Sequence, residues 1–354
     1  MCISSKQVDR DSATAYRMVS EGIGVLLAIL IQGKLIERVR TAGHCSHTNS
    51  TAPPHSLAEQ KWSYTLGSVI VIIIYVVCII AVFFGVKEKI VLKKDRAYSS
   101  YFKGIKTALT YGPFVKASMV FLFCSLAMAI VQGNIALYCT HTLKLVHFSN
   151  FIMLALVTSV ISMPVWQCLL IRFGKKKIYA TGMIIFIPVA LSQFLLPENA
   201  SYAYYIVVCI AGLSISVSLL LPWSILPDVL DLYLVERQER KDAIFYSFYV
   251  FFNKLATGLG LGISQVVLEL GGYVTGACAQ PESVSFTLRL LMTCPAVFML
   301  GGLLILWTYP IDERKRREIQ LEVQNRDPPL TSDDVLLTTE DTYDDAQETK
   351  FDDK

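Results

Sequence analysis

The sequence has few charged residues, and it lacks the short motifs that mark hydrolases, metalloenzymes and nucleotide-driven pumps. Only 17% of its 354 residues are Asp, Glu, Lys or Arg, whereas soluble domains contain about 25%. No His-Glu-x-x-His, Gly-x-Ser-x-Gly or P-loop motif is present, and the 5 histidines are scattered. Catalysis by a metal or a serine nucleophile, and ATP-driven transport by this chain, therefore have no motif to support them, and we do not expect an enzyme.

No cleavable signal peptide is visible either, because the first residues are polar and the first apolar run begins near Met18. The sequence is instead 53% hydrophobic, and its apolar residues gather in runs of about 20, enough to cross a bilayer as a helix. Many runs are rich in Val and Ile, but strands rarely exceed about eight residues. The sequence predicts an all-α, polytopic membrane protein with about eight spanning helices, at 16–36, 64–86, 115–139, 150–172, 178–196, 203–226, 243–268 and 286–309.

The distribution of Lys and Arg predicts the orientation of these helices. Basic residues gather after the second, fourth and last spans, at 87–106, 172–177 and 314–317, so these loops are expected on the cytoplasmic side. Lys34, Arg38 and Arg40 argue mildly the other way. The first outer loop contains the glycosylation sequon that begins at Asn49, which fits this topology. We expect a multi-pass protein of the plasma membrane, with the endoplasmic reticulum as the alternative.

Cysteines in the outer loops raise the question of a disulfide. Cys45 lies in the first outer loop and Cys278 in the last, on a face that permits oxidation. A bridge between them is favoured, with Cys139 as a rival partner and free thiols as the alternative.

The loop at 87–111 divides the chain unevenly. Many transporters consist of two six-helix bundles joined by a long inner loop. On that plan 1–86 would hold the last two helices of the first bundle, whose first four helices would not be in this sequence. The loop would be a basic cytoplasmic linker, 112–317 a complete six-helix bundle, and 318–354 a disordered acidic cytoplasmic tail.

Lys254 lies about three turns inside the seventh span, on a small and polar face shared with Ser247, Val250, Thr257 and Gly258. An ammonium at this depth is costly and usually faces a cavity or a partner. It could pair with a phosphate or carboxylate; the alternatives are snorkelling to the interface or pairing with a buried acid.

The aromatic run 245–252, which includes Phe248 and Phe252, indicates an interfacial belt or a contact for a lipid tail.

Ser224, Asp228 and Asp231 share one face of the sixth span. Pro227 removes a backbone donor and frees the carbonyl of Trp223. A broken helix end with acids beneath it could form a gate or hinge. The alternative is that the helix ends here, with the acids capping it or bridging to inner-loop arginines.

Three further polar residues lie inside expected spans: Glu21 in the first, and Gln132 and Asn134 in the third. Each could line a cavity or a cation path. The alternative is an interhelical hydrogen bond, worth about 0.6 kcal/mol.

Several stretches together resemble one known family. The chain is similar to the sodium-dependent lysophosphatidylcholine symporters and sphingosine-1-phosphate exporters of the major facilitator superfamily, which are related to sugar–cation symporters of the melibiose-carrier type. The resemblance covers about 9–317 and rests on DRDSATAYRM (9–18), FGKK (173–176), LPWS and LPD (221–228), the aromatic run with Lys254, and YPIDE (309–313).

The resemblance implies a major facilitator fold in which Lys254 faces the lipid phosphate, Asn49 is glycosylated and Cys45 pairs with Cys278. It implies Na+ as coupling ion and no organic cofactor, with the Na+ site incomplete because the family's sodium-site aspartate lies on a helix outside this sequence. A glutamate stands in the symporter at the place of Gln132.

The function expected is cation-coupled symport of lysophosphatidylcholine-type lipids by alternating access. Lys254, Thr257, Gln132, Phe248 and Phe252 are expected to bind the substrate. The gate or cation path is expected to involve Glu21, Asp228, Asp231 and Ser224.

Alternatives within the family are a sphingosine-1-phosphate exporter and a sugar–cation symporter. An alternative of another class is a truncated, non-transporting membrane protein that binds lipid or a partner. The expected partners are a lysolipid and membrane lipids, with no nucleic acid, and the transporter is expected to be monomeric.

Overall fold

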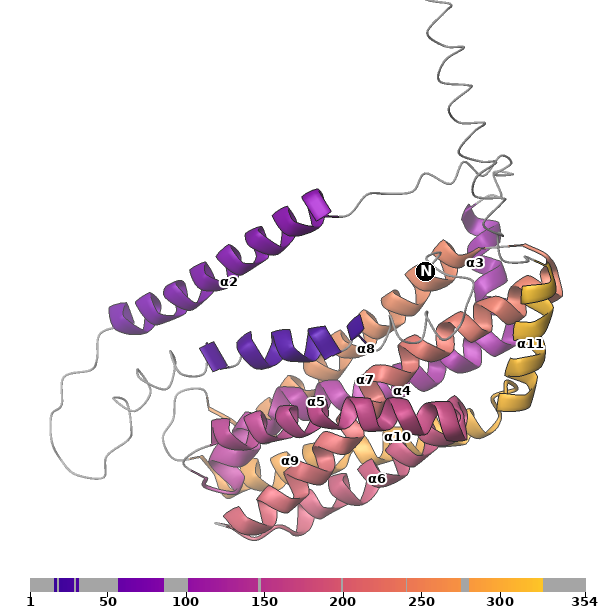
Figure 1. Ribbon diagram of the computed structural model, residues 1–354. Coiled ribbons are helices and arrows are strands. Elements are labelled where there is room, and N and C mark those ends of the chain that lie inside the picture. Colours follow the sequence, from indigo (N-terminus) through magenta and orange to yellow (C-terminus); the bar gives the residue numbers. More distant parts are fainter. Residues whose placement is uncertain are drawn as a thin grey trace, which may run out of the picture.

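The computed structural model describes residues 16–17, 19–28, 30–31, 57–85, 101–145, 148–198, 200–239, 241–274 and 280–326, and within these ranges its regular structure is entirely helical. Figure 1 shows the helices, most of them side by side in one bundle. Their bounds are α2 Leu57–Gly85, α3 Tyr101–Thr110, α4 Gly112–Leu137, the π-helix η2 Tyr138–Thr142, α5 Phe148–Phe173, α6 Lys175–Leu195, α7 Ser201–Arg237, α8 Asp242–Leu270, α9 Glu282–Thr293, α10 Pro295–Trp307 and α11 Glu313–Arg326.

The prediction of an all-α membrane protein is confirmed. In the described part of the chain, 7 helical segments are long and apolar enough to cross a membrane. They include all the predicted spans except the first, which is helical at its described positions and carries a shorter apolar stretch, Val19–Ala28. The chain is therefore a multi-pass membrane protein.

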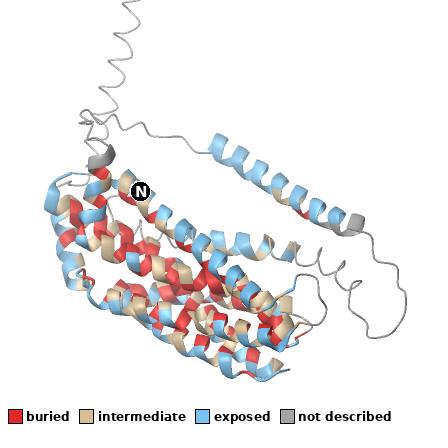
Figure 2. Ribbon diagram, turned by 180° about the vertical axis from the view of Figure 1, so that it is seen from behind, coloured by how far each residue is buried: buried red, intermediate tan, exposed pale blue. Residues whose placement is uncertain are grey.

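The spans from α4 to α10 form one bundle. Helix α7 packs against α5 and α6, and α4 packs against α8 and α10. Residues on the inner faces of the helices are mostly buried and those on the outer faces mostly exposed, as the colours of the ribbon in Figure 2 show. In lipid, close packing of small residues holds helices together. Gly212 of α7 is an example, since an added Cβ would lie 2.6 Å from the backbone oxygen of Ala155 on α5.

The two N-terminal segments differ from the bundle in their burial. Among the described residues of α2 only Gly67 is buried, and Figure 1 shows this helix apart from the others. Helix 19–28 instead touches α5, where an added Cβ at Gly22 would lie 2.8 Å from Val160. An apolar helix exposed on all sides is stable only in a membrane or against further protein.

The expected helix end near Pro227 is wrong. Helix α7 is 37 residues long and continues through Pro222 and Pro227 to Arg237. Each proline removes one backbone donor. Two neighbouring helices bond to this part of α7: Tyr249 Oη donates to the Pro222 oxygen at 2.8 Å and Lys175 Nζ to the Ser224 oxygen at 2.7 Å. Prolines are tolerated inside a spanning helix that its neighbours support in this way.

Three other boundaries differ from the sequence-based expectation. The last span is split at Cys294 into α9 and α10, because Pro295 supplies no backbone donor. The inner loop 87–111 contains the short helix α3, and α11 continues to Arg326, into the segment expected to be disordered. Burial of Ile319 against the bundle explains why the first part of that segment is helical.

Candidate functional site

Lys254 lies on the face of α8 that points away from the interior of the bundle. It is exposed, and it is the thirteenth residue of a 29-residue helix, so it lies about 18 Å along the axis from the first residue. The opposite face packs against the bundle through Phe245, Tyr249, Ala256, Gly260, Ser264 and Leu268. The face expected from the helical spacing is therefore present, and the ammonium is near the middle of a spanning helix.

Within the described part of the chain, Lys254 has no ion-pair or hydrogen-bond partner. Its neighbour Asn253 fixes the rotation of α8, because its Nδ2 donates to Ser125 Oγ on α4 at 3.3 Å. The alternative in which Lys254 pairs with a buried acid finds no support among the described residues. Its cationic head remains available to a ligand.

Gln132, also predicted to bind substrate, is exposed on α4 but lies at a different level from Lys254. The contact between Asn253 and Ser125 marks the level of Lys254. Gln132 follows Ser125 by seven residues, or about 10 Å. At its level Gly133 approaches Leu261, where an added Cβ would lie 2.6 Å from Cδ2. The two side chains therefore stand about two helical turns apart and could contact different parts of one elongated ligand.

The other residues proposed for substrate binding are close to Lys254 in the sequence and half-buried in the structure. Thr257 donates its hydroxyl to the Asn253 carbonyl at 2.9 Å, within the same helix. The rings of Phe248 and Phe252 are 6.4 Å apart. The exposed ring of Phe251 lies 5.7 Å from that of Phe252, so an apolar surface continues around α8 next to the lysine.

A second group of aromatic residues surrounds the proline-containing part of α7. The rings of Phe121 and Tyr249 stack at 4.4 Å, and Trp223 meets Tyr249 edge-on at 6.0 Å. The guanidinium of Arg17 lies over the Trp223 ring at 5.2 Å. This contact joins the first helical segment to α7. It could not be predicted from the sequence, because a cation–π pair between residues so far apart has no local signal.

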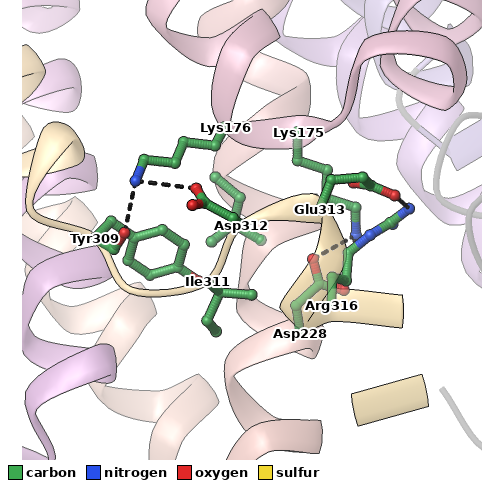
Figure 3. A pocket seen from close by; sticks show the side chains of 9 residues that line it. Lys175, Lys176, Asp228, Tyr309, Ile311, Asp312, Glu313 and Arg316 are labelled. Atoms are coloured by element: carbon green, nitrogen blue, oxygen red, sulfur yellow. Dashed lines mark hydrogen bonds and ion pairs between the residues drawn. The ribbon is translucent and has the colours of Figure 1, made fainter. Parts of the chain in front are cut away.

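Asp228 forms a buried ion pair with Lys175 of α6 (Figure 3). Lys175 Nζ lies 2.9 Å from Oδ2 and 3.0 Å from Oδ1, and the two side chains are only 5% and 6% exposed. The same ammonium donates to the Ser224 carbonyl. The expectation of acids beneath a broken helix end is thus corrected: Asp228 lies inside a continuous helix and bridges to a basic residue of the predicted inner loop, a lysine in place of the expected arginine.

The other polar residues singled out from the sequence have different environments. Ser224 is buried, Asp231 is half-buried and Glu21 is exposed. Asn134 is fully buried, and its Nδ2 donates to the Ile130 carbonyl of its own helix at 2.7 Å. Asn134 therefore has a structural role, whereas Glu21 remains accessible.

A small pocket lies beside the Lys175–Asp228 pair, at the predicted inner end of the bundle (Figure 3). The side chain of Lys176 lines the pocket, and its Nζ donates to the Tyr309 carbonyl at 2.7 Å. The lining residues are Lys175, Lys176, Ile225, Asp228, Tyr309, Ile311, Asp312, Glu313 and Arg316. Opposite charges here are matched within the protein, so the pocket joins α6, α7 and α11 and does not present a free charge to a ligand.

Tyr111 closes the same end of the bundle. Its hydroxyl donates to Glu236 Oε2 at 3.0 Å, which links the start of α4 to the end of α7. Burial, followed by the hydrogen bond to Glu236, raises the pKa of Tyr111 well above its usual range. The phenol therefore stays protonated and remains a donor.

Three predicted modification residues, Cys45, Asn49 and Cys278, lie outside the described residues, so the glycosylation and the disulfide remain predictions. Cys139, the rival disulfide partner, is fully buried and is a free thiol. Its Sγ lies 3.3 Å from the hydroxyl of Tyr204, which is also fully buried. The thiol therefore lies inside the bundle and not on the outer surface.

Comparison with known proteins identifies the family. The family described as MFS/sugar transport protein matches residues 1–313, and the chain belongs to it. The chain is 37% identical over 344 residues to sodium-dependent lysophosphatidylcholine symporter 1 of Homo sapiens, covering 92% of this chain and 62% of the relative.

Two further relatives show the same pattern. Sodium-dependent lysophosphatidylcholine symporter 1-B of Danio rerio is 39% identical over 337 residues, with 90% and 64% covered. The sphingosine-1-phosphate transporter MFSD2B of Xenopus tropicalis is 38% identical over 341 residues, with 91% and 65% covered. The chain thus spans less than two thirds of the length of these curated relatives.

Proposed function

We propose that this chain takes part in secondary-active transport of single-chain lysophospholipids by alternating access, coupled to Na+ and at the plasma membrane. The observation that carries this proposal is Lys254, an exposed cation near the middle of a spanning helix that has no partner among the described residues. Ionisable groups at this depth usually serve a substrate or ion path. The names of the relatives, lysophosphatidylcholine symporter and sphingosine-1-phosphate transporter, support a lipid substrate with one phosphate.

Lys254 would bind the phosphate of the lipid. A hydrogen bond to a charged group contributes about 1.5–3 kcal/mol when the site excludes water. Gln132, about 10 Å further along the bundle, would contact the polar group beyond the phosphate. Thr257 is half-buried and close to Lys254, so it would border the headgroup.

The aliphatic chain of the lipid would lie along the aromatic surface of α8. Phe248 and Phe252 are half-buried and stand one helical turn apart on this surface. Their rings can cover an acyl chain without any polar contact. A sugar can stack on one ring but would leave most of this continuous apolar surface uncovered, which favours a lipid over a sugar as the substrate.

The inner gate would form around Trp223 and the residues that follow it on α7. Arg17 stacks on Trp223 from a different part of the chain, so a movement of the first segment away from α7 would separate the two.

Lys175 anchors Ser224 and Asp228 to α6, so this part of α7 would form the stationary side of the gate. Asp231 would complete the gate, and Glu21, exposed one turn beyond Arg17, would lie on the cation path.

The two phospholipid substrates named for the relatives share a phosphate and one aliphatic chain and differ in the remaining headgroup. Lys254 can pair with either phosphate, so the structure favours the class and leaves two candidates. Competition of unlabelled lysophosphatidylcholine and sphingosine-1-phosphate against labelled lysophosphatidylcholine distinguishes them. Replacing external Na+ by K+ tests the coupling ion.

Uptake of labelled lysophosphatidylcholine by cells that express the chain tests the transport proposal. We expect Lys254→Ala to abolish uptake without a change in surface expression, and Lys254→Arg to retain part of it. Lys144→Ala is the control, because Lys144 is an exposed lysine beyond the end of a spanning helix, away from the level of Lys254. Normal uptake by Lys254→Ala would overturn the assignment. Lipid binding without uptake by the wild type would favour a non-transporting lipid-binding protein.

A further inference from the structure

Two segments that are far apart in the sequence are fixed side by side at the predicted inner end of the bundle. One is the turn between α5 and α6, and the other is the first turn of α11. Gly174, with φ 86, lies so close to Glu313 that an added Cβ would be 2.8 Å from Oε2. Lys176 ties the two segments together through the Tyr309 carbonyl and through Asp312 Oδ1 at 3.2 Å. Their relative position is therefore set by the fold.

Some of the cations of these segments are neutralised inside the protein. Lys175 pairs with Asp228, Lys176 pairs with Asp312, and Arg316 lies 2.6 Å from Glu313. These pairs hold the two segments to the bundle. The remaining cations point outward.

The outward-pointing cations form what we call the basic patch: Arg172, Lys177, Arg314, Lys315 and Arg317. Three of them, Arg172, Lys177 and Lys315, have no ion-pair partner among the described residues. The other two have partners at 3.3 and 3.5 Å, but their side chains are 93% and 69% exposed. Exposed pairs of this kind neutralise a cation only weakly.

Two exposed aromatic side chains stand at the same level as the basic patch. Trp307, 80% exposed, ends the span formed by α9 and α10, and Phe173, 48% exposed, ends α5. Trp and other aromatic side chains at the ends of spans mark the boundary between hydrocarbon and headgroups. The basic patch therefore lies at headgroup level, on the side that the charge distribution assigns to the cytoplasm.

We propose that the basic patch binds the headgroups of anionic phospholipids of the cytoplasmic leaflet, with phosphatidylserine as the typical ligand. A cluster of four to eight basic residues just beyond a spanning helix is the pattern that attracts such lipids. The site is separate from Lys254 and does not depend on the proposed transport activity.

A competing occupant is the end of the chain itself. Residues 327–354 contain ten Asp and Glu against two Lys, so this segment could cover the patch by charge. The basic patch and residues 327–354 would then neutralise each other, and the protein would show no preference for anionic lipids. The two occupants therefore predict different lipid preferences.

The experiment uses the full chain, purified in neutral detergent with equal amounts of phosphatidylserine and phosphatidylcholine, and counts the retained lipids by native mass spectrometry. The test variant is Arg172→Gln, Lys177→Gln and Lys315→Gln together, which breaks no ion pair among the described residues.

The control is Lys61→Gln with Lys144→Gln, two exposed lysines at the other end of the spans. A further variant, Asp341→Asn with Asp344→Asn and Asp345→Asn, weakens the acidic segment.

We expect the wild type and the control to retain phosphatidylserine at least about fivefold more strongly than phosphatidylcholine, the factor for one cation near an anionic surface. We expect the test variant to lose this preference, and raised ammonium acetate to reduce it in the wild type. The absence of a preference in the wild type, or its equal loss in the control, would overturn the proposal. A preference that appears only when the acidic segment is neutralised would assign the patch to that segment instead.

Discussion

The buried ion pair between Lys175 and Asp228 allows a quantitative test of how the inner end of the bundle is held together. Replacing Asp228 by Asn removes the negative charge but keeps the shape. The Lys175 ammonium, 5% exposed, would keep its bond to the Ser224 carbonyl but would face a neutral amide in place of the carboxylate. Breaking a buried pair in this way costs about 3–5 kcal/mol.

An exposed pair provides the matched comparison. Lys144 and Glu198 are only 2.6 Å apart, yet their side chains are 58% and 50% exposed. Because water screens this pair, Glu198→Gln should cost less than about 1 kcal/mol. The exposed pair has the shorter distance but is expected to be the weaker of the two. The comparison therefore separates the effect of burial from that of distance.

The assay is thermal unfolding in mild detergent, followed by a dye that becomes fluorescent on reaction with newly exposed thiols. Cys124 is a buried free thiol in the centre of the bundle and reports on its opening. With about 2–4 °C per kcal/mol for a domain of 150–250 residues, the size range of the bundle from α4 to α11, Asp228→Asn should lower the apparent midpoint by roughly 10 °C.

A double variant completes the test. Lys175→Met combined with Asp228→Leu removes both charges and fills the space with apolar atoms, which is often neutral or stabilising. We expect it to unfold near the wild-type temperature. The reasoning is refuted if Asp228→Asn is no more damaging than Glu198→Gln, or if the double variant is less stable than the single one.

Three further predictions concern packing and the outer loops. Gly212→Ala should destabilise the chain by about 1–3 kcal/mol through the clash of its Cβ with a backbone oxygen, whereas Gly262→Ala, with open space around it, should be neutral or slightly stabilising in the same thermal assay. Asn49→Gln should abolish the mobility shift that a glycosidase produces in the wild-type protein. Cys45→Ser and Cys278→Ser should each release one thiol to alkylation under non-reducing conditions, and no change would contradict the predicted disulfide.

The course of the helices could be predicted from the sequence because it depends on the length and polarity of apolar runs. The exposed position of Lys254 on α8 likewise follows from the 3.6-residue period. These are local properties. The continuation of α7 through two prolines could not be predicted, because it depends on packing against other helices, from which Tyr249 and Lys175 bond to α7.

The site was only partly predictable for the same reason. The sequence indicated that Asp228 could bridge to a basic residue, but only the packing of α6 against α7 selects Lys175 as the partner. The stacking of Arg17 on Trp223 and the different levels of Lys254 and Gln132 depend on how whole helices pack. Such contacts leave no periodic signal in the sequence.

The central claim is that Lys254 recognises the phosphate of a single-chain lipid, and a binding cycle tests it most directly. Wild type and Lys254→Ala would each be titrated with lysophosphatidylcholine and with a monoacylglycerol of the same chain length, which lacks the phosphate. With about 1.5–3 kcal/mol for a charged hydrogen bond, we predict that the substitution weakens binding of lysophosphatidylcholine by about 10- to 100-fold and leaves monoacylglycerol unchanged. An equal loss for both lipids, or no loss for lysophosphatidylcholine, would contradict the account.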